Sequence, residues 1–251
     1  TSLHNLKTDY VDIYQFHNPA VCPKPGDGSG LYEAMLEAKE QGKIRFIGIT
    51  NHRMSIAEEA IESGLYDTLQ FPFNYLSTER EIALAKACAE HEMGFIAMKA
   101  LSGGLITNSA AAYAFEAQYE NVLPIWGVQK ESELDEFLSY IGNPPELTDE
   151  LKAVIEKDQK ELAGEFCRGC GYCMPCPAGI EINNCARMSL LLRRSPSVRY
   201  LSPEGQAKMK KIEDCLHCGH CKSMCPYGLD TPKLLEENYK DYKEVLAGKK
   251  L

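Results

Sequence analysis

Hydrophobic runs suited to buried strands alternate with amphipathic helical stretches over the first 145 residues of this 251-residue chain. Such alternation predicts βα units around a parallel sheet. The predicted strands are residues 11–17, 46–50, 68–73, 95–99 and 122–128, and the predicted helices are 31–41, 56–63, 78–91, 110–119 and 132–141. Five units are too few to close a (β/α)8 barrel of about 250 residues. We therefore expect an α/β fold, a partial (β/α)8 TIM barrel of about the last five units, with about three units preceding Thr1.

The pattern changes at Asn143-Pro144-Pro145, which breaks the alternation. Thr148 then caps a highly charged helix that continues to about residue 162. Further helices are predicted at 182–194, 203–213 and 231–247. The sequence thus predicts two domains, a partial barrel over 1–145 and a helical domain over 146–251.

Eight of the eleven cysteines lie in two short runs, and each run ends in a Cys-Pro pair. The runs are Cys167-x2-Cys170-x2-Cys173-x2-Cys176 and Cys215-x2-Cys218-x2-Cys221-x3-Cys225. Cysteines at every third residue suit three corners of a [4Fe–4S] cluster, and in two-cluster ferredoxins the cysteine before the proline serves the other cluster. We therefore predict two [4Fe–4S] clusters. One is held by Cys167, Cys170, Cys173 and Cys225, and the other by Cys215, Cys218, Cys221 and Cys176.

Other uses of these cysteines fit the pattern less well. A zinc ribbon needs four ligands in two C-x2-C pairs, whereas this chain has eight in two longer runs. A disulfide framework is typical of short secreted chains, and no apolar signal segment is present here. Cys185 is an alternative ligand, because the first run is one residue shorter than usual before its Cys-Pro pair. The simpler interpretation of Cys185 is a buried helical thiol.

Composition restricts the partners. The formal net charge of −9 argues against nucleic acid and favours small-molecule or basic partners. No apolar stretch approaches the length that crosses a membrane. Free thiols and oxygen-sensitive clusters predict a cytoplasmic protein. Positive charge gathers at Arg193, Arg194 and Arg199, which we interpret as a solvated face or, alternatively, as a docking site for an acidic redox partner protein.

Two segments of the first part resemble the aldo/keto reductases. LKTDYVDIYQFH at residues 6–17 is similar to that family's fourth strand, and GKIRFIGITN at residues 42–51 is similar to the following strand. The resemblance covers about residues 1–141. The helices that bridge the two cysteine runs resemble an α-helical ferredoxin domain. CRGCGYCMPCP at residues 167–177 is typical of aldo/keto reductases of anaerobes that end in a two-cluster ferredoxin domain. The chain thus resembles the C-terminal part of such a fusion.

The resemblance implies a carbonyl-reducing site. In the family a Tyr acts as general acid, a Lys and an Asp tune it, and a His orients the substrate carbonyl. His17 matches that His, and it lies at the end of a barrel strand, where barrel chemistry takes place. Without the family, a satisfied core histidine is the alternative. The Asp, Tyr and Lys belong to earlier strands that this chain lacks, so we expect the 251 residues alone to be inactive.

The resemblance also implies a nicotinamide site. Thr50 and Asn51 match the family's Ser-Asn pair, and Gln70 matches the Gln that completes a carboxamide-binding set. Hydroxyl and amide groups suit a carboxamide, which both donates and accepts hydrogen bonds. Lys99 and the Ser102-Gly103-Gly104 turn suit a pyrophosphate, because a cation and open backbone amides bind anions.

Two positions depart from the family pattern. Met98 stands where an aromatic residue commonly stacks on the nicotinamide. Glu133 aligns with the basic residue that pairs with the 2′-phosphate of NADP. A carboxylate repels a phosphate but accepts hydrogen bonds from a ribose diol. This favours NAD, or a flavin in its place, whereas Lys130 keeps NADP open.

The expected function must combine two kinds of electron transfer. Nicotinamide transfers a hydride, which carries two electrons, whereas each cluster passes one. One hypothesis is an oxidoreductase that couples nicotinamide or flavin chemistry on a carbonyl-type substrate to the clusters. A second is a reductase whose clusters are structural or sensory. A third is a non-catalytic electron carrier with a barrel remnant. Whether this chain is an enzyme stays open at the level of sequence.

Overall fold

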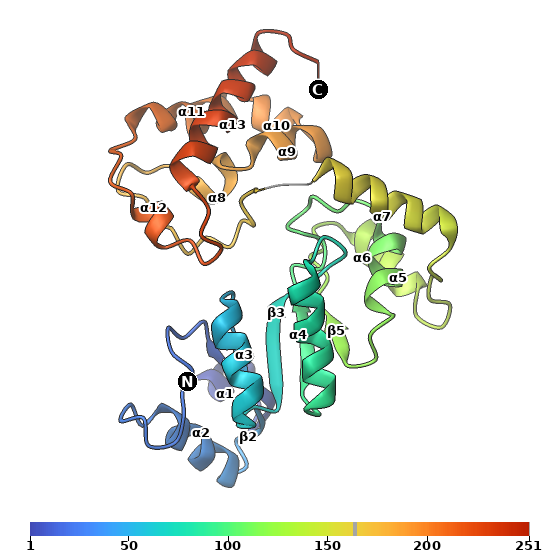
Figure 1. The fold of residues 1–251 in the computed structure, drawn as a ribbon, viewed down its shortest axis with the longest axis vertical. Helices are drawn as coiled ribbons and strands as arrows, with labels where there is room; N and C mark the ends of the chain where they lie inside the picture. The colour runs from blue at the N-terminus through green and yellow to red at the C-terminus, as the bar shows by residue number, and fades with distance from the viewer. Residues whose placement is uncertain (163–164, 251) are drawn as a thin grey trace. The chain divides into compact units, whose positions relative to one another are not determined.

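The structure is a computed structural model that describes residues 1–162 and 165–250 (Figure 1). These residues form two compact units. The first comprises Thr1–Ala100, Ala112–Val128 and Leu138–Leu147, and the second comprises Leu101–Ala111, Gln129–Phe137 and the described residues from Thr148 onward. The predicted domain limits of 1–145 and 146–251 differ from these units, because Leu101–Ala111 and Gln129–Phe137 belong to the second unit. The limits of the domains stay a prediction.

Strands and helices alternate up to residue 139. The strands are β1 (Val11–His17), β2 (Ile44–Thr50), β3 (Thr68–Pro72), β4 (Gly94–Met98) and β5 (Val122–Pro124). The helices are α1 (Ser2–Leu6), α2 (Leu31–Glu40), α3 (Met54–Ser63), α4 (Glu79–Glu90), α5 (Ser109–Glu116) and α6 (Glu131–Ser139). The predicted alternation is confirmed, apart from the short helix before β1, which the sequence pattern did not predict.

The five strands form one parallel sheet in the order β1-β2-β3-β4-β5, so β1 and β5 are its edges. The prediction of five parallel strands is confirmed: β1 has the predicted limits, and those of β2, β3 and β4 differ by one or two residues. The fifth strand is wrong in length, because 122–128 was expected and only Val122–Pro124 is strand. The last hydrogen bond to β4 follows Pro124 directly, where the N–H of Ile125 donates to the carbonyl oxygen of Ala97 at 2.9 Å.

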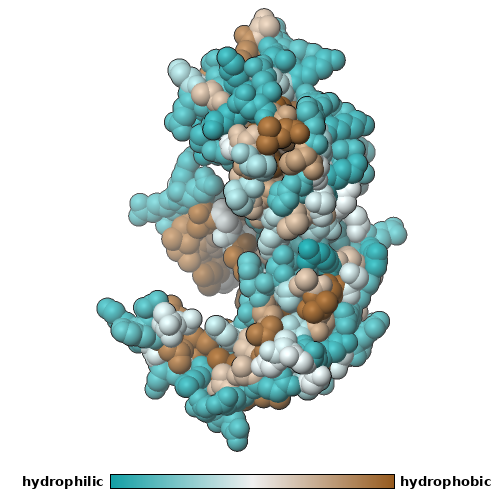
Figure 2. Space-filling view, turned by 90° about the vertical axis from the view of Figure 1, so that its left-hand side faces the viewer, coloured by the Kyte–Doolittle hydropathy of each residue, from teal (hydrophilic) through white to brown (hydrophobic). Residues whose placement is uncertain are grey.

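Side chains alternate between the two faces of each strand. Ile47 and Ile49 of β2, like Leu69 and Phe71 of β3, belong to the core that packs under α2, α3 and α4. The residues between them point to the opposite face. There Phe46 pairs with Ile13 of β1, and their exposed fractions are 41% and 38%. Figure 2 shows hydrophobic residues gathered in patches on the surface of the molecule.

The second unit contains short helices and one long one. They are α7 (Asp149–Glu161), α8 (Ile182–Cys185), α9 (Met188–Arg194), α10 (Val198–Leu201), α11 (Pro203–Lys210), α12 (His220–Ser223) and α13 (Thr231–Leu246), with a 3-10 helix at Lys211–Asp214. The predicted helix over 182–194 is wrong as a single element. It divides at Arg187, whose φ of −139° leaves the helical region. No helix of the described residues is both long enough and apolar enough to cross a membrane.

Glu116, the last residue of α5, has a carboxyl group inside the first unit. Its exposed fraction is 2%, and neither carboxylate oxygen has a hydrogen-bond partner among the described residues. Burial raises the pKa of this carboxyl to about 9 from an ordinary 4.5. A buried acid without a partner is held neutral, because desolvation penalises its charged form.

We expect Glu116 to make the first unit less stable as the pH rises. Between pH 4.5 and about 9 the folded state holds a proton that the unfolded state has lost, so the free energy of unfolding falls across this window. Glu116→Gln should abolish that fall and raise stability near neutral pH by about 1–3 kcal/mol. Denaturant unfolding at about pH 5.5 and pH 8, followed by the fluorescence of the single tryptophan, Trp126, tests this. Glu120→Gln, at an exposed site, is the control, and an unchanged pH dependence in Glu116→Gln would contradict the expectation.

Candidate functional site

His17, Thr50 and Gln70 are partners across three neighbouring strands. His17 ends β1 and pairs with Thr50 at the end of β2, and Thr50 pairs with Gln70 in β3. Register partners in a parallel sheet share a face, so the three side chains form one row. Thr50 is buried, Gln70 is half-buried and His17 is exposed. The row places an imidazole, a hydroxyl and an amide near the carboxyl ends of the strands, where active sites of parallel α/β folds are found.

Asn51 has a structural role that the sequence did not predict. Its side chain is buried and donates from Nδ2 to the carbonyl oxygen of Pro19 at 2.9 Å. Its Oδ1 accepts hydrogen bonds from the backbone N–H groups of His52 and Arg53, both at 2.9 Å. These bonds fix the turn that leads from β2 into α3. The amide of Asn51 is therefore engaged within the loop.

Gln15 lies beside Gln70 and was not singled out from the sequence. Its Nε2 donates to Oε1 of Gln70 at 3.0 Å, while Nε2 of Gln70 approaches Sδ of Met98 at 3.8 Å. Gln15 Oε1 and Thr68 Oγ1 are buried without a hydrogen-bond partner among the described residues. A Cβ on Gly48 would lie 2.3 Å from Thr68 Oγ1, so only glycine fits there. Gln15 precedes His17 by two residues, and this period of two is the signal that could have identified it.

Lys99 and His52 lie close to the row. Lys99 follows β4 with a φ of 60°, and its carbonyl oxygen accepts a hydrogen bond from Asn74 Nδ2 at 2.9 Å. Burial, with a smaller contribution from the positive charges of Lys99, His17 and Arg53, lowers the pKa of His52 to about 4. The side chains of His17 and Lys99, at the ends of β1 and β4, therefore act electrostatically on His52, which follows β2. His52 directly follows the Thr50-Asn51 pair, but its residue type alone gave no reason to select it.

Removal of the Lys99 charge should raise the pKa of His52. We expect Lys99→Met to shift this pKa upward from about 4, because one of the cations that disfavour the imidazolium is lost. Burial is the largest cause of the shift, so the pKa should stay below the ordinary 6.5. Titration of the His52 imidazole by NMR measures it, with Lys86→Met at an exposed site of α4 as the control. Identical His52 titrations in the two variants would contradict the proximity of Lys99.

Glu133 and the Ser102-Gly103-Gly104 turn belong to the second unit. Oε2 of Glu133 accepts hydrogen bonds from the backbone N–H groups of Gln129 at 2.7 Å and Lys130 at 3.3 Å. The carboxylate therefore occupies backbone donors just before α6. Gly103 lies against Arg187, because a Cβ at this position would be 2.7 Å from Arg187 Nη1. The sequence predicted neither contact.

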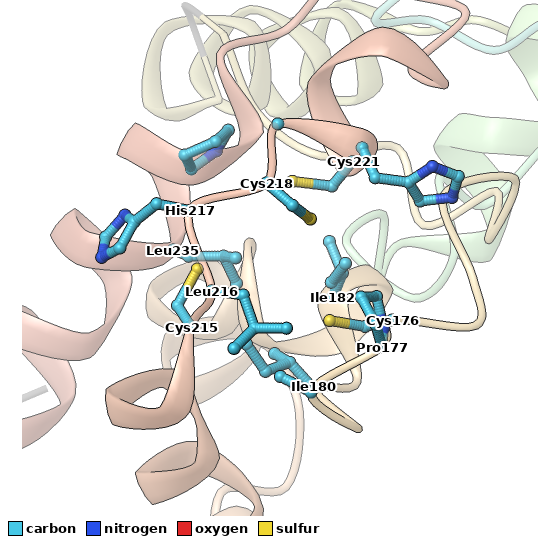
Figure 3. A pocket seen from close by; sticks show the side chains of 14 residues that line it. Cys176, Pro177, Ile180, Ile182, Cys215, Leu216, His217, Cys218, Cys221 and Leu235 are labelled. Carbon is cyan, nitrogen blue, oxygen red and sulfur yellow. The ribbon is translucent and has the colours of Figure 1, made fainter.

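The eight cysteines of the two runs line two separate cavities, each with four of them. The second-run cavity combines three cysteines of the second run with the last cysteine of the first run (Figure 3). The first-run cavity combines three cysteines of the first run with the last cysteine of the second run. The cysteines of the second-run cavity are Cys215, Cys218, Cys221 and Cys176, and those of the first-run cavity are Cys167, Cys170, Cys173 and Cys225. Each cavity is lined by one of the two sets that the spacing predicts, and cluster binding by these sets stays a prediction.

Cysteines of one run also act electrostatically on cysteines of the other run. Burial raises the pKa of Cys167, and the charges of Cys170 and Cys225 raise it further. Burial also raises the pKa of Cys221, with contributions from Cys215 and Cys176. Clustered thiols that disfavour one another's ionisation are the donors that a positively charged iron centre stabilises as thiolates.

The remaining cysteines have a different environment. Cys185 is buried in α8 and lines neither cavity, and Cys22 and Cys88 lie in the core of the first unit. All eleven cysteines are described, and none forms a disulfide. Among the described residues, no group of three or more His, Cys, Asp or Glu side chains is arranged to hold a single metal ion. Four thiolates around a cubane surround a larger body than one ion does.

The basic residues do not form a free positive face. Arg193 makes two hydrogen bonds to Asp241, at 2.6 and 3.0 Å. Arg194 binds Asp158 at 2.8 Å and Glu161 at 2.6 Å. Arg199 lies over the ring of its neighbour Tyr200. Arg193 and Arg194 thus hold the second unit together, which the count of charges along the sequence did not show.

Comparison with known proteins identifies two domains in this chain. Residues 1–111 match the model of the aldo/keto reductase family, and residues 166–230 match the model of the 4Fe-4S dicluster domain. The chain therefore contains an aldo/keto reductase domain and a 4Fe–4S dicluster domain, as the resemblance of its motifs implied.

Individual relatives match the first of these domains. The chain is 35% identical over 122 residues to the methylglyoxal reductase DkgB of Salmonella typhimurium, a match that covers 45% of this chain and 44% of that protein. It is 28% identical over 120 residues to the uncharacterized oxidoreductase YqkF of Bacillus subtilis, covering 48% of this chain and 38% of that protein. The chain thus spans less than half the length of these relatives.

A solved structure shares the fold. The aldo-keto reductase from Bacillus halodurans, in its apo form, superposes with a TM-score of 0.53 at 20% identity, covering 65% of this chain and 67% of that chain. Similarity at this level of identity concerns the fold alone. The α/β architecture with five parallel strands is therefore of the aldo/keto reductase type.

Proposed function

We propose that this chain is part of an iron–sulfur oxidoreductase that couples nicotinamide or flavin redox chemistry on a carbonyl-type substrate to two [4Fe–4S] clusters. The observation that carries the proposal is the division of eight cysteines between two cavities, in a chain that also contains an aldo/keto reductase domain. Neither feature alone would indicate coupled chemistry, since a reductase needs no cysteines and a ferredoxin needs no barrel.

The donor set fits the proposed clusters. Each cavity offers four thiols and no carboxylate among its lining residues, which matches the all-thiolate ligation of a [4Fe–4S] cluster. The lining of the second-run cavity is otherwise mainly apolar, with Ile180, Ile182 and Leu235, and apolar walls protect such centres from water. When bound, each cluster supplies one-electron redox chemistry.

The sheet residues would serve the other half of the reaction. His17 is exposed at the end of β1 and would orient a substrate carbonyl by donating a hydrogen bond. Thr50 and Gln70 in the same row would bind a carboxamide, and the Lys99 ammonium would pair with a pyrophosphate. The similarity to a methylglyoxal reductase supports a small carbonyl compound as the substrate class.

A flavin is the group that would reconcile the two halves. A flavin can accept a hydride and release its two electrons one at a time, whereas nicotinamide transfers only a hydride and a cluster passes only single electrons. The second candidate function is electron transfer without catalysis, and the exposure of Cys218 favours it, because exposed ligands suit exchange with a redox partner protein. Reduction of the clusters by NADH in the purified protein would distinguish coupled chemistry from simple electron carriage.

The first test of the proposal is the metal content. Protein purified without oxygen should contain about eight iron and eight sulfide per chain, because two four-thiol sets are present. Iron and sulfide analysis with a zinc assay measures this. Stoichiometric zinc, or about four iron, would contradict the assignment of two clusters.

The exchange of fourth ligands can be tested separately. Cys176→Ala should impair the cluster of the second run, and Cys225→Ala the cluster of the first run, because each residue lines the cavity of the opposite run. EPR spectra of the two reduced centres report which one is lost. Cys185→Ala is the matched control, since this thiol is buried in α8 outside both cavities. A loss confined to the mutated run would contradict the exchange.

The position of Glu133 predicts a preference for NADH. Its carboxylate already occupies the N–H groups of Gln129 and Lys130, which would otherwise be donors for a 2′-phosphate. We expect Glu133→Arg to narrow or reverse the preference for NADH over NADPH, by about 1–3 kcal/mol in binding free energy. Equilibrium titration of both cofactors measures this. Glu131→Arg, at an exposed position of the same helix, is the control, and equal effects of the two variants would contradict the role of Glu133.

A further inference from the structure

Arg187 lies at the break between α8 and α9, and the long helix α13 holds that break in place. Asn238 of α13 is buried, and its Nδ2 donates to the carbonyl oxygen of Ala186 at 3.1 Å. Its Oδ1 accepts a hydrogen bond from the N–H of Ser189 at 2.8 Å. One side chain thus joins the residues on both sides of Arg187. The orientation of Arg187 is set by buried contacts and not by a flexible loop.

The guanidinium of Arg187 has buried donors without acceptors. Nε and Nη1 are inaccessible to solvent and have no hydrogen-bond partner among the described residues. A buried charged donor that is left unpaired costs a few kcal/mol, so such groups call for an explanation. Arg193 and Arg194, six and seven positions further on, are fully paired with carboxylates. Arg187 is the exception in this part of the chain.

Two glycines enclose the guanidinium. Gly169 lies between Cys167 and Cys170, and a Cβ there would be 2.9 Å from Cζ of Arg187. Gly103 approaches from the segment Leu101–Ala111, where a Cβ would be 2.7 Å from Nη1. Backbone can approach a planar cation this closely only where no side chain intervenes. The first cysteine run therefore wraps directly over Arg187.

Cys167 is the thiol next to this cation. Its Sγ accepts a hydrogen bond at 3.4 Å from the N–H of Gly169, the glycine that packs against the guanidinium of Arg187. The lining of the first-run cavity includes Arg168, whereas no arginine or lysine lines the second-run cavity. Buried Arg187 thus adds a further positive charge beside the first set of cysteines.

We propose that Arg187 stabilises the reduced state of the cluster held by Cys167, Cys170, Cys173 and Cys225, and so raises the reduction potential of that centre. The inference rests on the proposed function. Addition of one electron makes the centre and its four thiolates more negative by one charge, and a fixed cation in a poorly hydrated site offsets that charge without uptake of a proton. Arg187 would act on the added negative charge of this centre through Cys167, and it is therefore a positioning residue.

The test is an EPR-monitored redox titration of the full chain. In Arg187→Gln one of the two potentials should fall by at least about 59 mV, a tenfold change in a one-electron equilibrium, while the other moves less. Arg187→Lys keeps the charge and should retain most of the wild-type potential. Arg199→Gln removes a cation that lines neither cavity and should leave both potentials near their wild-type values.

A pair of glycine variants gives a second measurement. Gly103→Ala displaces the guanidinium without touching the cysteine run, and should move the same potential as Arg187→Gln. Gly104→Ala has a comparable backbone cost, since both glycines have a positive φ, but no atom lies within 4 Å of its added Cβ. Gly104→Ala should therefore leave the potential unchanged. Equal potentials in the two variants would contradict the inference.

The outcomes separate this inference from the proposed function. Wild-type protein without clusters would overturn the proposed function itself. Clusters with unchanged potentials in Arg187→Gln would overturn only the role of Arg187. If Arg187→Gln loses iron, Arg187→Lys distinguishes the role of the charge from a packing role. Recovery of the iron and of the potential in Arg187→Lys supports a role of the charge. Failure of the lysine variant to recover either would show a packing role and overturn the inference.

Discussion

Each cavity of thiols in this chain is complete only when the opposite cysteine run is in place. Cys176 lies with the second run and Cys225 with the first, so neither run can form its four-thiol set alone. The proline after each of these cysteines restricts the backbone conformation there. The helices between the runs must therefore fold back, and α13 supplies buried Leu235 and Asn238 where they return. The organisation of the second unit follows from this mutual dependence.

The first unit depends on the register of its parallel sheet as the second unit depends on its paired cysteine runs. Parallel strands with helices between them end at one edge, so residues that are far apart in the sequence meet there. His17, Thr50 and Gln70 meet because each strand is paired without a bulge, and a slip of one residue would turn a strand's side chains toward the helices. Gly48 contributes by leaving space for Thr68 and Gln15. Local sequence and sheet geometry together place the row.

The sequence predicted the features that depend on local pattern or on fixed spacing. Strand periodicity located β1 to β4, and the cysteine spacing identified the sets that line the two cavities. Features that depend on contacts between distant residues could not be read in this way. The approach of Gly103 to Arg187 and the hydrogen bonds of Asn238 to the α8–α9 break join segments with no common period. Asn51 was selected because it matches the family's Ser-Asn pair, and that match does not reveal that its amide is engaged in the loop.

Two one-electron centres, if bound as proposed, would match the two electrons of one hydride. Burial raises the pKa of Cys173, and among the charges that raise it further is that of Cys221, so the two sets of thiols are electrostatic neighbours. One set includes the exposed Cys218, whereas the other lies over buried Arg187. With clusters bound as proposed, the buried cation beside the first set would favour the reduced state of that centre over that of the exposed set. This asymmetry would distinguish two otherwise similar sets of four thiolates.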